Sequence, residues 1–128
     1  MAAGKVKFVW HDFAFLGRES VWAAEAARCA AEQGKFWEYH DTLFAEQGAE
    51  NSGTFEKHNL KRFAAELGLD TARFDACLDR DRELDAVRQG DEDAQRRGIQ
   101  GTPSLFVDGR PLGGIPTFDQ LRALVEQG

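Results

Sequence analysis

The sequence has few of the residues on which disulfide-rich or membrane-spanning folds depend. Its 128 residues include two cysteines, three prolines and one tyrosine. No apolar run approaches the ~20 residues that cross a bilayer. Positive charge is also scarce, because 16 Lys and Arg stand against 22 Asp and Glu, for a net charge of −6. That sign is wrong for binding nucleic acid or an anionic membrane surface, so we expect no nucleic-acid partner and no membrane span.

What is present is typical of a soluble, folded domain. Hydrophobic residues make up 42% of the chain and charged residues 30%, unlike the composition of a disordered or fibrous protein. The length suits one domain, with room for an insertion but not for two ordinary cores. Cys29 and Cys77 lie too far apart in the sequence for a Cys-x-x-Cys redox motif or a zinc-binding pair. From their spacing alone they are either free thiols or one disulfide.

The first three quarters of the chain predict one strand followed by helices. Residues 5–10 are rich in β-branched and aromatic side chains, which favour a strand. Ser20 and Asp70 are the predicted N-caps of the first and fourth helices. Residues 47–53 have loop composition and form the predicted mobile segment. Apolar residues recur at helical spacing in five segments, at residues 20–33, 35–46, 60–67, 70–78 and 80–97.

The last thirty residues change from a helical to an extended pattern. Residues 104–107 and 110–113 flank an Asp-Gly pair, which predicts a β-hairpin. Thr117 and Gln120 fit a capping box at the start of a final helix. The apolar side chains expected to form its buried stripe are Phe118, Leu121, Leu124 and Val125. The order strand, five helices, strand, strand, helix indicates an α/β domain with a helical insertion.

Common catalytic and cofactor motifs are missing. Residues 98–103 lack the glycine spacing and the lysine of a phosphate-binding loop, and the chain has no Gly-x-Ser-x-Gly sequence. His11, His40 and His58 fall in three different elements, and none forms a ligand pair on one helix face. We interpret them as ordinary surface or boundary histidines, and we expect no metal ion and no cofactor.

Three segments resemble a known family. Residues 101–110, Gly-Thr-Pro-Ser-Leu-Phe-Val-Asp-Gly-Arg, resemble the cis-proline loop and following hairpin of thioredoxin-like proteins. The resemblance is closest to the DsbA family of thiol–disulfide oxidoreductases. Residues 24–41 and 66–78 are similar to two stretches of the helical insertion found in many bacterial DsbA-like proteins.

The resemblance implies a fold and a binding site. It implies an α/β, thioredoxin-like core formed by residues 1–16 and 98–128, with a helical domain inserted at residues 17–97. Thr102 and Pro103 would form the cis-proline loop beside the active site. In this family the exposed backbone there pairs with an extended segment of a protein or peptide substrate. The simpler alternative is that Pro103 is trans and only begins a strand.

The departure from the family concerns the catalytic motif. Family enzymes place Cys-x-x-Cys at a helix N-terminus, where the thiolate is stabilised, and this sequence contains no such motif. The first core strand, the motif and the active-site helix would all lie upstream of Met1, so we assign no catalytic residue. The chain is thus interpreted as an oxidoreductase-family protein that is inactive alone. The alternative is a non-catalytic module that binds a peptide or protein through Thr102, Pro103 and the aromatic helix at residues 36–44.

The resemblance to the DsbA family also bears on the location and the assembly of the protein. The family implies the bacterial periplasm or cell envelope, whereas the lack of an apolar signal region implies the cytoplasm if Met1 is the native start. The missing strand would leave a gap between residues 5–10 and 104–107. A rearranged pairing of these strands, or exchange with a second copy in a homodimer, would satisfy their backbone groups.

The two cysteines lie on apolar helix faces, a setting that raises a thiol pKa and makes the thiol inert. A structural disulfide between Cys29 and Cys77 is therefore the leading interpretation. Two buried free thiols come second, and a substitute catalytic pair comes last.

Overall fold

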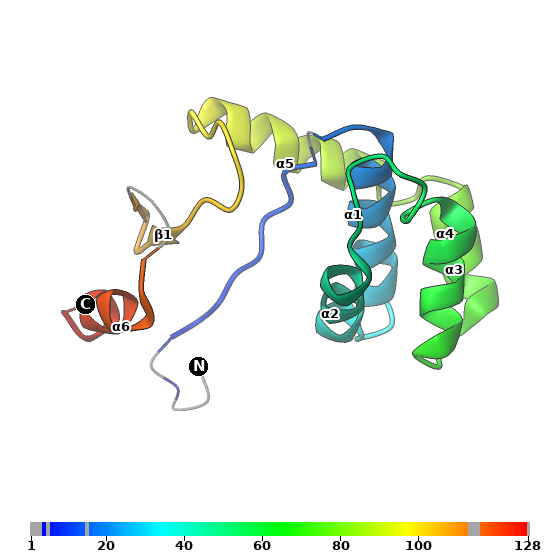
Figure 1. The fold of residues 1–128 in the computed structure, drawn as a ribbon, viewed down its shortest axis with the longest axis horizontal. Helices are drawn as coiled ribbons and strands as arrows, with labels where there is room; N and C mark the ends of the chain where they lie inside the picture. The colour runs from blue at the N-terminus through cyan, green and yellow to red at the C-terminus, as the bar shows by residue number, and fades with distance from the viewer. Residues whose placement is uncertain (1–3, 5, 15, 113–115, 128) are drawn as a thin grey trace. The chain divides into compact units, whose positions relative to one another are not determined.

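The structure is a computed structural model that describes residue 4 and residues 6–14, 16–112 and 116–127 (Figure 1). Lys5 and Gly113, which the sequence places in strands, lie outside the described residues. The elements are α1 (Arg18–Ala31), α2 (Phe36–Glu46), α3 (Lys57–Glu66), α4 (Thr71–Asp79), α5 (Leu84–Arg96), β1 (Phe106–Val107), β2 (Arg110–Pro111) and α6 (Phe118–Gln127). The five predicted inserted helices and the final helix are thus all present.

The chain divides into two compact units, residues 12–93 and residues 1–11 with 94–128. In the first unit, α1 packs against α2, α3 and α4 (Figure 1). An alanine-rich face on α1 lets its neighbours approach closely, and Tyr39 donates a hydrogen bond of 2.8 Å from its hydroxyl to the Leu60 carbonyl oxygen. The buried core consists of Ala23, Ala26, Ala27, Cys29, Ala30, Tyr39, Leu60, Phe63, Ala64, Leu69, Phe74, Cys77 and Leu78.

The N-terminus of α1 is capped from a distant part of the chain. The N-cap residue is Gly17, at φ 112°, so the predicted cap at Ser20 is wrong. Glycine has no side chain that could cap the helix, and Asn51 takes that role. Its Oδ1 accepts a hydrogen bond from the Glu19 amide at 3.2 Å, and its Nδ2 donates one to the Leu16 carbonyl oxygen at 3.0 Å. A Cβ atom on Gly17 would overlap the Asn51 amide, so this cap requires glycine.

Part of the segment predicted to be mobile forms hydrogen bonds to the start of α1. The Glu19 carboxylate accepts hydrogen bonds from the Gly53 amide at 3.0 and 3.1 Å and from the Phe55 amide at 3.0 Å. Together with the Asn51 contacts, these bonds hold residues 51–55 against the start of α1. The sequence composition indicated a loop correctly but did not reveal these long-range partners.

Two other predicted caps are confirmed. The Asp70 side chain accepts from the Arg73 amide at 3.2 Å and begins α4. At the start of α6, the Gln120 amide donates to the Thr117 hydroxyl at 3.2 Å, and the Thr117 amide donates to the Gln120 side chain at 3.0 Å. These reciprocal bonds are the predicted capping box.

The second unit contains less regular structure than the sequence predicts. β1 and β2 form an antiparallel hairpin in which Val107 pairs with Arg110, and Asp108 and Gly109 occupy its turn at φ 50° and 79°. The predicted strand at residues 5–10 is wrong for its described part, because residues 6–10 belong to no β-ladder. A ladder needs a neighbouring strand, and the sheet of the described residues has only the two hairpin strands.

The predicted buried stripe of α6 is also corrected. Phe118 is 76% exposed and Leu124 is 37% exposed, while Leu121 and Val125 are half-buried. A hairpin with two residues in each strand offers too little surface to cover a whole helix face.

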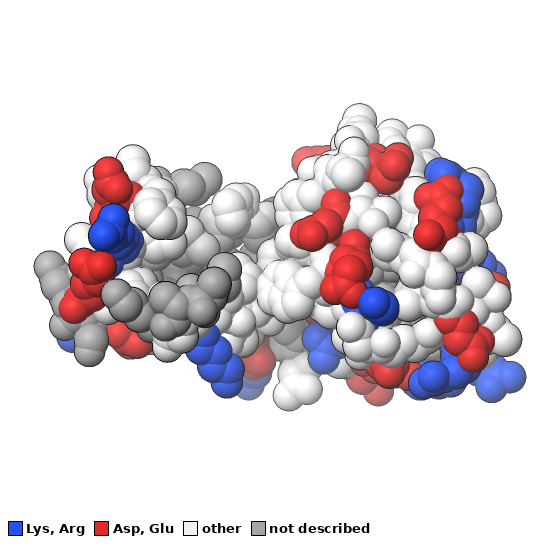
Figure 2. Space-filling view, turned by 90° about the horizontal axis from the view of Figure 1, so that it is seen from below, with Lys and Arg blue, Asp and Glu red and all other residues white. Residues whose placement is uncertain are grey.

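None of the described helices has the length and apolar character needed to cross a membrane. On the face drawn in Figure 2, acidic side chains are scattered among basic and uncharged ones.

Candidate functional site

The loop before β1 presents an open stretch of backbone. The peptide bond between Thr102 and Pro103 is cis, and both residues are exposed. The Ser104 hydroxyl donates to the Gly101 carbonyl oxygen at 2.6 Å, which closes the loop around them. The backbone amide and carbonyl of Thr102 form no hydrogen bond to another described residue. These polar groups are therefore exposed at the surface of the described residues.

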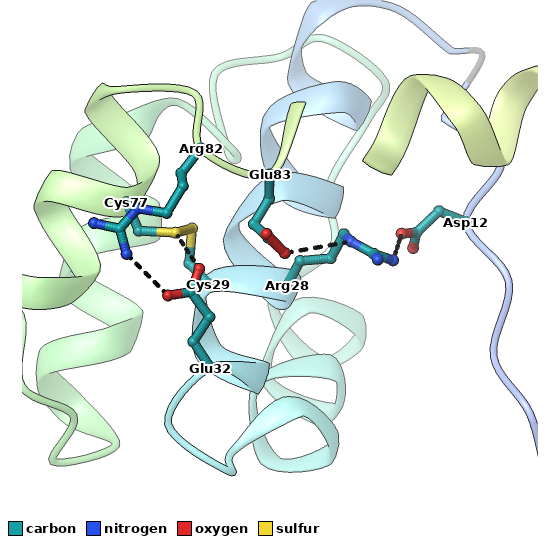
Figure 3. Close-up of polar contacts among 7 residues, drawn as sticks. All are labelled: Asp12, Arg28, Cys29, Glu32, Cys77, Arg82 and Glu83. Carbon is teal, nitrogen blue, oxygen red and sulfur yellow. Dashed lines mark hydrogen bonds and ion pairs between the residues drawn. A yellow bond between two sulfur atoms is a disulfide. The ribbon is translucent and has the colours of Figure 1, made fainter. Parts of the chain in front are cut away.

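The two cysteines form a disulfide between α1 and α4 (Figure 3). Their Cα atoms are 5.9 Å apart, and Cys29 and Cys77 are only 1% and 2% exposed. A thiolate must reach a sulfur atom to attack a disulfide, and this burial keeps the thiol of a protein substrate away from the sulfurs. In this conformation the bond holds two helices together and is shielded from a protein-sized substrate.

A carboxylate lies against the disulfide. Oε2 of Glu32 is 3.1 Å from Sγ of Cys77, and Oε1 of Glu32 accepts a hydrogen bond from Nη1 of Arg82 at 3.0 Å (Figure 3). The sulfur atoms of a disulfide carry no hydrogen, so the first contact is van der Waals and electrostatic. The second contact is an ion pair that fixes the direction of the carboxylate.

A second polar cluster holds the start of the helical unit. Nη1 of Arg28 lies 3.0 Å from Oδ2 of the buried Asp12, and Nε of Arg28 lies 3.7 Å from Oε1 of Glu83 (Figure 3). Oδ1 of Asp91 accepts from the Ala14 amide at 2.7 Å. Burial raises the pKa of Asp91, this hydrogen bond lowers it, and the nearby charge of Asp12 raises it; the net shift is upward. The cluster fastens residues 12–14 to α1 and α5.

Glu25 is the most deeply buried carboxyl group among the described residues, at 1% exposure. Its Oε1 atom has no hydrogen-bond partner among them. Burial, followed by the charge and a hydrogen bond of Asp81, raises the pKa of Glu25 from 4.5 to about 7, against the lowering effects of Lys57 and Arg88. Glu25 therefore exchanges a proton near neutral pH.

The histidines remain in three separate places. His11 is exposed, and His58 Nδ1 lies 3.5 Å from Oε2 of Glu56. His40 Nδ1 lies 3.0 Å from Oδ1 of Asp41, and its ring packs between those of Trp37 and Phe44 on α2, at 5.2 and 4.8 Å. Among the described residues, no group of three metal-ligating side chains includes a histidine.

Sequence reasoning singled out the two cysteines but missed Glu25 and Glu32. Both share the face of α1 that carries Cys29, because they lie four residues before it and three residues after it. A carboxylate at such a position on an otherwise apolar stripe is the signal that would have drawn attention to them. Asn51, by contrast, leaves no local signal, because its partners are more than thirty residues away.

The comparison with protein families gives one clear match. The sequence profile of a family described as thioredoxin matches residues 1–127. A solved structure described as a thioredoxin-like oxidoreductase from Silicibacter pomeroyi DSS-3 superposes with a TM-score of 0.76 at 28% identity, covering 93% of this chain and 66% of its own. The described fold is therefore a helix-rich, thioredoxin-like fold.

Curated relatives carry two kinds of name. A "Probable disulfide bond formation protein D" from Bacillus anthracis is 26% identical over 128 residues, covering 97% of this chain and 58% of its own length. A "Na(+)/H(+) antiporter NhaA" from Herminiimonas arsenicoxydans is 41% identical over 104 residues, which are 81% of this chain but 16% of the relative. A "Na(+)/H(+) antiporter NhaA 3" from Salinispora tropica is 36% identical, and the match covers 18% of it. The chain spans about a sixth of the length of these antiporter relatives.

Proposed function

The chain belongs to the thioredoxin family, and we propose that it is the substrate-binding portion of a thiol–disulfide oxidoreductase of the DsbA type. Its oxidoreductase neighbour and its disulfide-formation relative support the general class. The observation that carries the finer proposal is the exposed loop at Thr102 and Pro103, whose backbone polar groups face no described partner. Main-chain pairing there gives affinity for an extended polypeptide with little dependence on its sequence.

The redox step needs a thiolate that this chain does not supply in accessible form. Thiol–disulfide exchange proceeds through attack by a thiolate, and the sequence has no Cys-x-x-Cys motif. Cys29 and Cys77 are bonded to each other and buried. We therefore expect no acceleration of insulin reduction by dithiothreitol over the background rate. A measurable acceleration that disappears when both cysteines are changed to Ala would overturn this part of the proposal.

Completion of the sheet is the second part of the proposal. The hairpin has two short strands, and Val6 and Val9 are 37% and 55% exposed in a segment that belongs to no β-ladder. A strand added at the edge of the hairpin would extend the sheet and cover these apolar side chains at once. A second copy of the chain is one source of that strand, and a homodimer is then expected in sedimentation experiments. A monomer at high concentration would exclude the dimer.

Peptide binding tests the role of the Thr102 backbone. The probe is a fluorescein-labelled decapeptide of alternating Val and Thr, measured by fluorescence anisotropy against the full chain. Thr102→Ala keeps the amide and should leave affinity unchanged, whereas Thr102→Pro removes the amide and should weaken binding at least about tenfold. A peptide N-methylated at alternate residues should also bind weakly. Equal binding by both peptides and both variants would refute strand addition at this loop.

A different candidate is a non-catalytic binding module. The observation in its favour is that several relatives are long proteins named as ion antiporters, in which the matching segment is about a sixth of the whole. The in-frame codons upstream of Met1 distinguish the two candidates. A strand followed by Cys-x-x-Cys favours the oxidoreductase, and its absence favours the binding module.

A further inference from the structure

Three potential metal ligands meet at the junction of α1 and α4. Among the described residues, the Sγ atoms of Cys29 and Cys77 and a carboxylate oxygen of Glu32 all lie within 4.8 Å of one another (Figure 3). While the sulfurs are bonded to each other they are neutral and bind metals poorly, because the thiolate is the ligand form. We propose that reduction of the Cys29–Cys77 disulfide converts this group into a zinc-binding site.

The spacing of the two helices suits both states. Tetrahedral zinc holds thiolate sulfurs at about 2.3 Å, which places them about 3.8 Å from each other. The Cα atoms of Cys29 and Cys77 are 5.9 Å apart. Each sulfur lies about 2.8 Å from its own Cα, so rotation about the two Cα–Cβ bonds reaches the zinc separation without moving the helices. The backbone that holds the disulfide is thus already placed for the metal.

Glu32 is positioned as the third ligand. Its Oε2 faces the Cys77 sulfur at 3.1 Å, while Arg82 holds Oε1 at 3.0 Å and so orients the carboxylate. Such an orienting partner is typical of carboxylate ligands in metal sites. Charge also balances, because two thiolates and one carboxylate around Zn²⁺ leave one negative charge that the Arg82 guanidinium offsets.

The site opens to solvent on the Glu32 side. The Glu32 side chain is 29% exposed, whereas both cysteines are buried. A metal ion bound to the sulfurs would therefore meet solvent beside Glu32, where a water molecule would complete the tetrahedron. The buried sulfurs would shield the bound ion from solvent, and the exposed carboxylate would be its contact with solvent.

The chemistry needs one two-electron reductant and releases two protons. A trialkylphosphine transfers two electrons to the disulfide and becomes a phosphine oxide; water supplies its oxygen, and the two protons of that water end on the cysteine sulfurs. A dithiol does the same by forming its own disulfide and passing two protons to the sulfurs. Zn²⁺ then displaces both thiol protons as the two metal–sulfur bonds form.

Metal titration of the full chain tests the proposal. The protein is reduced with a trialkylphosphine, which avoids dithiol chelators, and is titrated with ZnCl₂ while an indicator competes for the metal. We expect one equivalent of Zn²⁺ to bind the reduced chain and none to bind the oxidised chain. Co²⁺ in place of Zn²⁺ should produce a thiolate-to-cobalt charge-transfer band in the near ultraviolet. Absence of binding by the reduced chain would overturn the proposal.

Matched variants assign the ligands. Glu32→Gln should weaken Zn²⁺ binding at least about tenfold and leave the charge-transfer band in place. Glu66→Gln removes a carboxylate that is similarly paired with an arginine, at 3.0 Å from Arg62, but lies away from the sulfurs and should change nothing. The double change Cys29→Ala, Cys77→Ala should abolish binding. Circular dichroism checks that the reduced chain keeps its helices, and an unfolded reduced chain that Zn²⁺ does not refold contradicts the site.

Discussion

Replacing Glu25 by Gln should remove a large part of the pH dependence of folding. Glu25 is 1% exposed, and its pKa is raised from 4.5 to about 7 by burial and by Asp81. The folded protein therefore holds the proton more tightly than the unfolded chain. The stabilisation is full below the unfolded pKa of 4.5 and is lost as the pH rises through about 7.

The size of the effect follows from the shift. Each pKa unit corresponds to about 1.4 kcal/mol, so the rise from 4.5 to about 7 amounts to about 3 kcal/mol. Glu25→Gln has nearly the same volume and stays neutral at every pH. Relative to the wild type, the variant should therefore gain about 3 kcal/mol in unfolding free energy between pH 4.5 and about pH 8. This difference is independent of any constant change in packing.

Urea denaturation followed by circular dichroism at several pH values measures this difference. Glu66→Gln is the control, because this exposed carboxylate pairs with Arg62 on one helix face and should shift stability by less than about 0.5 kcal/mol. Parallel pH profiles for the wild type and Glu25→Gln would refute the reasoning. They would show that Glu25 has the same proton affinity in the folded and unfolded chains.

Three further changes test the contacts that hold the helical unit. Changing Cys29 and Cys77 to Ala should lower the unfolding free energy by about 4 kcal/mol, since the bond closes a loop of 48 residues, and urea titration under oxidising conditions measures the loss. Asn51→Ala should lower the unfolding free energy by about 1–2 kcal/mol and speed amide exchange at the start of α1, because two hydrogen bonds disappear. Unchanged amide exchange at the start of α1 would contradict the cap by Asn51. Asp70→Ala should remove about 1 kcal/mol through loss of the α4 cap, whereas Asp70→Asn should retain most of it in the same titration.

The local features of the fold could be predicted from the sequence. The six helices follow from the spacing of apolar residues, and the caps at Asp70 and Thr117 need partners only three residues away. The start of α1 could not be predicted, because its cap comes from Asn51 on a distant turn. The strand expected at residues 5–10 is absent from the described residues 6–10 for a related reason: side-chain preference does not supply the neighbour that a β-ladder requires.

The candidate site shows the same division between local and distant information. The residues at Thr102 and Pro103 were identified by resemblance, and the structure adds that their loop is closed by Ser104 and exposed. The proton affinity of Glu25 depends first on its burial and then on Asp81, which lies in the turn between α4 and α5 and outside any helical pattern of α1. Glu32 gains its direction from Arg82, fifty positions further along the chain. Such electrostatic partners become visible only once the helices are packed.

The most direct test of the central claim is an NMR titration of the isotope-labelled chain with the alternating Val-Thr peptide. Pairing of an extended peptide with the loop predicts that the Thr102 amide shifts most strongly and becomes protected from exchange with solvent, with smaller shifts along Ser104 and β1. The N-methylated peptide should produce no such protection. Shifts confined to α2, or no change at Thr102 at saturating peptide, would contradict the claim that this chain is the substrate-binding portion of an oxidoreductase.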